Sequence, residues 1–187
     1  MNNKIEIEYS EKIDEKELEN IDNKKNINEL VEKVLGAALL KENIPSNFFI
    51  TLNFITDQEI NDLNRIHRGI DNITDVLSFP LLNKNDIHKI IEANIEINDK
   101  KTNMQDLDTM ISVYLDNYWV LGEIFINLEQ IKKQSIEYNH SFKRELSYIL
   151  VHSFYHLLGF DHMNDDDKKQ MRIKEEELLE ELDILRG

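Results

Sequence analysis

Three histidines towards the C-terminal end of the chain have the spacing of ligands to one metal ion. They lie in the segment His152-Ser-Phe-Tyr-His156-Leu-Leu-Gly159-Phe-Asp-His162. On a helix, the first two histidines are one turn apart and point the same way. Gly159 allows the backbone to leave the helix in a left-handed conformation, so that His162 can turn back towards them. Three neutral imidazoles with a fourth position for water are typical of a catalytic zinc site, whereas closed structural sites are usually rich in cysteine, which this chain lacks. We therefore expect one Zn²⁺ ion bound by His152, His156, His162 and water.

The same spacing occurs in the metzincin motif H-E-x-x-H-x-x-G-x-x-H, in which a glutamate follows the first histidine and activates the metal-bound water. In this chain Ser153 occupies that position. A serine hydroxyl does not act as a general base near neutral pH without help. The pattern therefore keeps the metal ligands and lacks the base of a peptidase.

Length and composition indicate a globular protein. A chain of 187 residues has the usual size of a single domain. Hydrophobic residues make up 41% and charged residues 32%, and no apolar run is long enough to span a bilayer. Because no signal peptide opens the sequence and cysteine is absent, we expect a cytoplasmic protein without a membrane partner.

The net charge of −15 argues against broad, non-specific binding to nucleic acid, since the average field repels phosphate. A bound metal dication and a few clustered cationic side chains can still make one cleft locally positive. The candidates are Arg65, Arg68, Lys132, Lys133, Lys143 and Arg144. Taken singly, the last four are expected to lie on solvated helix faces.

Apolar periodicity predicts the elements that position the histidines. Strands are expected at residues 5–9, 48–55, 74–79 and 119–127, the last broken by Gly122. Helices are expected at 27–41, from the capping box at Thr56 to near Gly69, at 128–138 and 142–158, and at 164–185 with a cap at Asn164 and three aspartates in its first turn. The helix at 142–158 carries the first two histidines. Residues 83–118 are expected to be an insertion, with a short helix around 87–93.

Four blocks together resemble one family. They are Leu63-Asn-Arg-Ile-His-Arg68, Thr74-Asp-Val-Leu-Ser-Phe-Pro80, Leu121-Gly-Glu-Ile-Phe-Ile126 and the triple-histidine segment. In this order, from about Phe48 to the C-terminus, they are similar to the YbeY family of bacterial endoribonucleases. The resemblance implies a metal-dependent, single-strand-specific endoribonuclease of ribosomal RNA maturation and ribosome quality control. It also implies an α+β fold, with residues 1–187 as a single zincin-like domain in which a small mixed sheet packs with helices around a central metal-bearing helix.

The resemblance also assigns site residues. By position, His152, His156 and His162 match the metal ligands of the family, and Arg68 matches its functionally important arginine, which makes it the catalytic candidate.

The chain departs from the family pattern at several positions. Ser153 stands where glycine is common, and helix propensity suggests that this change is harmless or mildly favourable. His67 and Phe160 replace tyrosines, and Glu123 replaces an aspartate. Phe160 has no phenolic hydroxyl, so any hydrogen bond made by the family's tyrosine is absent here.

The expected mechanism has the metal lower the pKa of its water towards about 7 and polarise a phosphoryl oxygen of RNA. Arg68 would donate two hydrogen bonds to the phosphate and offset charge in the transition state. Activation of the RNA 2′-hydroxyl by the metal is an alternative that the sequence leaves open. The expected partner is ribosomal RNA or a ribosomal subunit, and DNA is not expected. Two other functions remain open: a zincin-like metallopeptidase, and a non-catalytic ribosome-assembly factor whose metal is structural.

Overall fold

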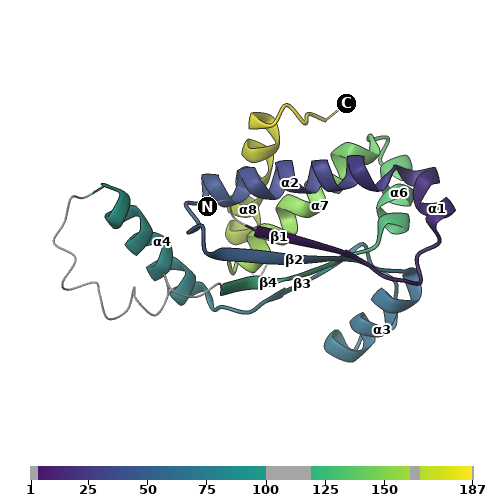
Figure 1. Cartoon of the computed structure of the whole chain (residues 1–187), viewed down its shortest axis with the longest axis horizontal. Coiled ribbons are helices and arrows are strands. Elements are labelled where there is room, and N and C mark those ends of the chain that lie inside the picture. The colour runs from purple at the N-terminus through teal and green to yellow at the C-terminus, as the bar shows by residue number, and fades with distance from the viewer. Residues whose placement is uncertain (1–3, 100–118, 161–164, 187) are drawn as a thin grey trace.

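A computed structural model describes residues 4–99, 119–160 and 165–186 of the chain (Figure 1). Four strands form one sheet, and seven helices are present among these residues. This is the α+β class that was predicted. The elements are β1 (Lys4–Tyr9), α1 (Glu15–Ile21), α2 (Lys24–Lys41), β2 (Phe48–Phe54), α3 (Asp57–Arg68), β3 (Val76–Pro80), α4 (Lys84–Asp99), β4 (Trp119–Ile126), α6 (Leu128–Glu137), α7 (Phe142–Leu157) and α8 (Asp165–Glu181).

The sheet is mixed, with strand order β1-β2-β4-β3. β1, β2 and β4 run parallel, while β3 pairs antiparallel with β4 at one edge. The predicted break of the fourth strand at Gly122 is wrong, because β4 continues through it with a shift in its register to β2 between Phe49 and Ile50. A β-carbon on Gly122 would lie 2.5 Å from Leu157 Cδ2 and 2.6 Å from the Phe79 carbonyl oxygen. The glycine therefore allows α7 to approach the sheet closely.

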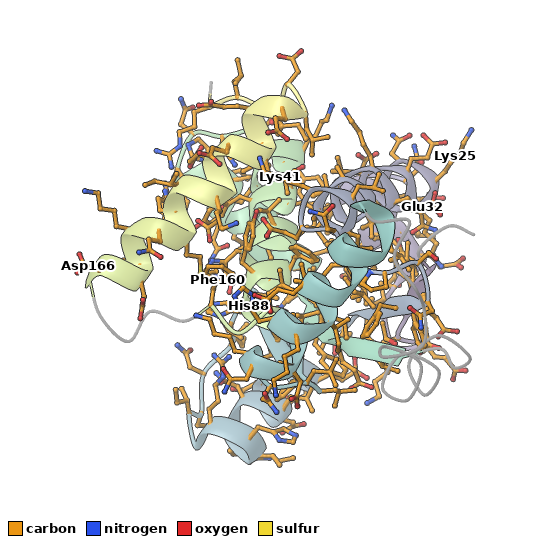
Figure 2. The ribbon with its side chains drawn as sticks, turned by 90° about the vertical axis from the view of Figure 1, so that its left-hand side faces the viewer. Lys25, Glu32, Lys41, His88, Phe160 and Asp166 are labelled. Atoms are coloured by element: carbon orange, nitrogen blue, oxygen red, sulfur yellow. The ribbon has the colours of Figure 1, made fainter. Side chains whose placement is uncertain are left out.

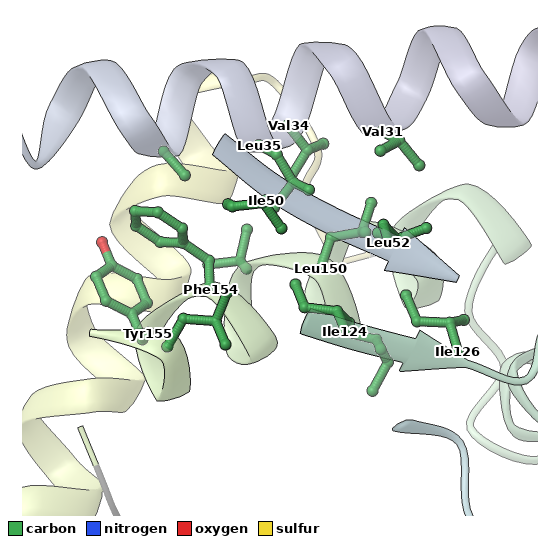
Figure 3. Close-up of a cluster of buried hydrophobic side chains, with 14 of the residues drawn as sticks. Val31, Val34, Leu35, Ile50, Leu52, Ile124, Ile126, Leu150, Phe154 and Tyr155 are labelled. Carbon is green, nitrogen blue, oxygen red and sulfur yellow. The ribbon is translucent and has the colours of Figure 1, made fainter. Parts of the chain in front are cut away.

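Most helices cover one face of the sheet. Figure 1 shows α2, α6, α7 and α8 on this side, α3 on the other side, and α4 projecting away from the sheet. Alternate residues of β2 are buried: Phe48, Ile50, Leu52 and Phe54. Figure 3 shows Ile50 and Leu52 with Ile124 and Ile126 of β4, facing Val31 and Leu35 of α2 and Leu150 and Phe154 of α7. This apolar layer between sheet and helices is the main core.

The histidine-bearing helix α7 lies in the centre of the fold, as predicted. Eleven of its sixteen residues are buried, and it contacts α2, α6, α8, β3 and β4. A helix that is apolar around most of its circumference is a core helix. Its few unburied residues are therefore the ones that can form a site.

Local signals placed most helix ends correctly. The capping box of α3 is present, since the Thr56 hydroxyl accepts from the Glu59 N–H and the Glu59 carboxylate accepts from the Thr56 N–H. Gly69 ends this helix with φ of +70°.

Two helices differ from the prediction. Helix α1 was not predicted, because a single buried residue, Leu18, gives no repeating apolar pattern in the sequence. α4 is longer than the expected helix at 87–93, and Asn164 lies outside the described residues.

None of the helices in the described part of the chain combines the length and apolar content needed to cross a membrane.

Replacing Gly122 with alanine should destabilise the protein by about 1–3 kcal/mol, because the new methyl group would overlap Leu157 and the Phe79 carbonyl. The matched control is Gly36→Ala in α2, where nothing lies within 4 Å of the added β-carbon. Removing a glycine from a helix interior should stabilise the protein by about 0.5–1 kcal/mol. Urea unfolding measures both changes, and equal effects of the two substitutions would contradict the close approach of α7 at Gly122.

Candidate metal centre

The C-terminal end of α7 is a tight, well-defined turn. Gly159 has φ of +78°, the left-handed conformation predicted for it. The Gly159 N–H donates to the His156 carbonyl and the Phe160 N–H donates to the Tyr155 carbonyl, each at 3.0 Å. These two bonds form a Schellman motif, which satisfies the last carbonyls of the helix. The turn brings the carbonyl of Phe160 back beside the ring of His156.

His152 and His156 point to the same place from successive turns of α7. Their Nε2 atoms are 3.1 Å apart, and their rings are nearly perpendicular, with centroids 4.5 Å apart. Both side chains are partly buried. The structure thus brings together the first two of the three histidines that the sequence singled out.

Each histidine is held through its other ring nitrogen. His156 Nδ1 lies 2.9 Å from the Phe160 carbonyl oxygen, and His152 Nδ1 lies 2.7 Å from Glu175 Oε1. A carbonyl and a carboxylate only accept hydrogen bonds, so Nδ1 must be the protonated nitrogen of each ring. In the neutral form of each ring, Nε2 then carries a lone pair, and the two Nε2 atoms lie 3.1 Å apart. This is the usual arrangement of metal-binding histidines, and the donor set therefore fits zinc.

Glu175 is a site residue that sequence reasoning missed. It comes from α8, and its side chain is 2% exposed, against 19% for His152. Its position carries a signal in the sequence: Met171, Glu175 and Leu178 follow the three-and-four spacing of the buried face of α8, so that a carboxylate interrupts an apolar stripe. Buried carboxylates are rare unless they are paired. A glutamate on a buried face is therefore a candidate partner for a nearby histidine.

Ser153 is fully buried, and its hydroxyl oxygen has no hydrogen-bond partner among the described residues. A side chain inside the core cannot activate water in a cleft, which strengthens the case against a peptidase base at this position. A buried hydroxyl without a partner also costs free energy of folding. This argues against the expectation, drawn from helix propensity, that serine is harmless here.

Phe160 contributes packing in place of a tyrosine hydroxyl. Its ring lies 5.5 Å from that of Tyr155, and the ammonium groups of Lys84 and Lys174 lie 5.1 and 5.6 Å from its centroid. Figure 2 shows Phe160 between α8 and α4. The ring therefore helps to fix the turn whose carbonyl holds His156.

The structure does not place the other predicted site residues beside the histidine pair. His162 and Asp161 lie outside the described residues. Within the described ranges, no group of three or more histidine, cysteine, aspartate or glutamate side chains is arranged to hold a metal ion. Arg68 is exposed at the end of α3 and makes no hydrogen bond to either histidine. Its neighbour His67 packs its ring 4.9 Å from that of Phe79 on β3.

One residue expected at the solvated surface is not there. Arg144 is 4% exposed, although sequence reasoning placed it on a solvated helix face. Nearby, His140 is partly buried and lies 3.1 Å from the carboxylate of Glu145, which is itself buried. Lys133 is 58% exposed, as expected, and pairs with Asp57.

The fold and the histidine pair define an α+β protein with a candidate metal centre on its central helix. Comparison with known proteins identifies the family, because the family model described as Endoribonuclease YbeY matches residues 11–183. The chain belongs to the Endoribonuclease YbeY family. The family model thus matches the chain from residue 11, whereas the resemblance carried by the four sequence blocks begins only at about Phe48.

Relatives of the same description match over most of their length. The chain is 44% identical over 160 residues to Endoribonuclease YbeY of Clostridium botulinum, covering 83% of this chain and 88% of the relative. It is 41% identical over 174 residues to that of Clostridium beijerinckii, covering 89% and 98%. A solution structure of a Thermotoga maritima protein is 27% identical, covers 95% of this chain and 88% of that chain, and has a TM-score of 0.47.

Replacing Ser153 with alanine should stabilise the protein by about 1 kcal/mol, because the substitution removes a buried hydroxyl that has no partner. The control is Ser147→Ala on the same helix. Ser147 is equally buried, but its hydroxyl donates to the Lys143 carbonyl at 2.7 Å, so its loss should be neutral or destabilising. Thermal and urea unfolding test the difference, and a loss of stability in Ser153→Ala would contradict the assignment.

Proposed function

We propose that this protein is a metal-dependent, single-strand-specific endoribonuclease that acts in ribosomal RNA maturation and ribosome quality control in the cytoplasm. Membership of the Endoribonuclease YbeY family supports cleavage of RNA. The observation that carries the metal dependence is the pair of imidazoles on α7, whose Nε2 atoms are 3.1 Å apart while both Nδ1 atoms are engaged elsewhere. The substrate proposed is ribosomal RNA, free or within a ribosomal subunit.

His152, His156 and His162 would hold one zinc ion. Bound there, zinc supplies a Lewis acid that polarises a phosphoryl oxygen and activates the attacking group. The carboxylate of Glu175 orients His152 and raises the basicity of its Nε2, as acidic partners of metal-binding histidines do. The Phe160 carbonyl orients His156 through the Schellman turn. Both rings are thus held in place before any ligand arrives.

Arg68 is proposed to bind the phosphate at the cleavage position. It is the last residue of α3, it is exposed, and within the described residues its guanidinium group makes no ion pair or hydrogen bond. Its guanidinium group can donate two parallel hydrogen bonds to phosphate oxygens and offset charge that grows on them during cleavage. Arg65, one turn earlier, is by contrast paired with Asp62 at 2.7 Å.

The two alternative functions make different demands on the site. A metallopeptidase needs a general base beside the first histidine, and the buried Ser153 does not provide one. A non-catalytic assembly factor needs only the bound metal, so it predicts no dependence of RNA cleavage on Arg68. The experiments below separate these cases.

Metal content tests the proposed ligand set. Purified wild-type protein should carry about one zinc per chain, measured by mass spectrometry, and His156→Ala should lose it. Glu175→Gln removes the charge behind His152 and should weaken zinc binding roughly tenfold in competition with a chromophoric chelator. The control, Glu177→Gln, changes an exposed carboxylate on the same helix and should leave zinc affinity unaltered. Stoichiometric metal in His156→Ala would refute the ligand assignment.

Cleavage of a short unstructured RNA tests the role of Arg68. Arg68→Ala should lower kcat by about 10²–10³-fold while zinc content and unfolding temperature stay at wild-type values. Arg65→Ala, which removes the same charge one turn away, should change kcat little because its guanidinium is already paired with Asp62. Equal cleavage by wild type and Arg68→Ala would remove Arg68 from the mechanism. Absence of metal-dependent cleavage by the wild type would favour the assembly factor.

A further inference from the structure

A cluster of arginines lies further along α7 from the histidine pair and has no part in the site described so far. It is a pocket of about 320 Å³ between the start of α7, α8 and the C-terminal segment. We call it the arginine pocket, because Arg144, Arg172 and Arg186 line it together with Tyr138 and Tyr148. The whole chain has only five arginines, so three of them meet here.

The carboxylates near the arginine pocket offer fewer hydrogen-bond acceptors than the three guanidinium groups have donors. One carboxylate, that of Glu176, is shared among them, at 2.9 Å from Arg144, 3.3 Å from Arg172 and 2.6 Å from Arg186. A guanidinium carries five N–H donors, whereas a carboxylate accepts about four hydrogen bonds. The acidic side chain that lines the pocket itself, Glu145, is 3.1 Å from His140.

Arg144 shows the shortage of acceptors most clearly. It is 4% exposed, yet among the described residues its Nε and Nη1 atoms have no hydrogen-bond partner. Buried donors without acceptors are costly, and arginine is almost never fully buried unless it is paired. A structural role in clamping Glu176 uses only the remaining nitrogen, Nη2. The free donors are of the type that an oxyanion in the pocket would satisfy, preferably a phosphate, which guanidinium groups bind through paired hydrogen bonds.

The arginine pocket lies on the same face of α7 as the histidine pair. Arg144, Tyr148, His152 and His156 follow one another at intervals of four residues, which places them along one side of the helix. The ring of Tyr148 is 5.8 Å from that of His152 and stacks with the guanidinium groups of Arg144 and Arg172, at 5.7 and 5.3 Å. Eight residues of helix span about 12 Å, a distance that a few nucleotides cover.

We propose that the arginine pocket binds a backbone phosphate of the single-stranded RNA, a few nucleotides from the position of cleavage. This inference rests on the proposed nuclease function and adds a second contact point for the strand. Tyr138 on the rim is 53% exposed and can stack on a base, as aromatic side chains do in single-strand binding sites. A locally cationic pocket would let a chain of net charge −15 hold RNA despite its average field.

The test uses the two exposed arginines, Arg172 and Arg186, because replacing the buried Arg144 could disturb folding. Binding of a fluorescent, unstructured oligoribonucleotide is measured by anisotropy with a chelator present, so that no RNA is cut. The double variant Arg172→Gln/Arg186→Gln should bind roughly tenfold more weakly than wild type. The slope of log affinity against log salt should become shallower by about 0.7, the change for one lost phosphate contact on a single strand. With metal restored, KM should rise while kcat stays near the wild-type value.

The control removes the same amount of charge elsewhere, in Lys16→Gln/Lys89→Gln on α1 and α4, which lie at opposite ends of the molecule in Figure 1. It should retain wild-type affinity and salt slope. The conservative pair Arg172→Lys/Arg186→Lys should recover most of the binding lost in the glutamine pair. If wild type binds and cuts RNA but the glutamine pair behaves like the control, or loses kcat alone, the pocket proposal is wrong and the nuclease function stands. If wild type binds no RNA, the proposed function itself fails.

Discussion

The burial of α7 is the constraint on which the rest of this structure depends. The helix packs against the sheet and three other helices, so eleven of its sixteen residues are buried. The unburied residues beyond its first turn are Tyr148, His152 and His156, which are four residues apart and therefore share one face. The candidate site is thus the one side of a core helix that the core does not use. Rigid packing of the other sides holds the imidazole rings in a fixed position relative to the sheet.

The face of α7 that carries Tyr148, His152 and His156 is polar, and side chains of α8 provide hydrogen-bond partners that offset the free-energy cost of covering it. Glu175 accepts from His152, and Arg172 donates to the Tyr148 hydroxyl at 3.1 Å. Burial, and next the negative charge of Glu175, raise the pKa of Tyr148 to about 12, so this hydroxyl stays protonated at neutral pH. A buried carboxylate is costly unless it is hydrogen-bonded, and here it contacts groups that can donate to it. One row of side chains from α8 therefore connects the histidine pair to the arginine pocket.

The charge distribution reconciles an acidic chain with a nucleic-acid substrate. A net charge of −15 repels RNA at long range, and the effect weakens as salt screens it. Recognition must then come from short-range, directed contacts, for which arginine is better suited than lysine because its planar group donates in pairs. Three of the five arginines line one pocket, and a fourth, Arg68, ends α3 without a partner among the described residues. The seventeen lysines of the chain, in contrast, include many on solvated surfaces.

The sequence by itself determined the features that depend on neighbouring residues. Alternation placed β1, β-branched and aromatic composition placed β2, the Thr56–Glu59 pair placed the start of α3, and the need for a left-handed residue placed Gly69 and Gly159 at helix ends. The four-residue spacing of His152 and His156 likewise puts both side chains on one face through helix geometry alone.

Tertiary structure decided the features that depend on contacts between distant segments. Gly122 is needed inside β4 because Leu157 packs against it, and the carboxylate of Glu175 contacts His152, 23 positions away in the sequence. It also buried Arg144 and the Ser153 hydroxyl. The physical reason is that hydrogen bonds within a turn or cap are encoded by adjacent side chains, whereas burial depends on which elements pack together.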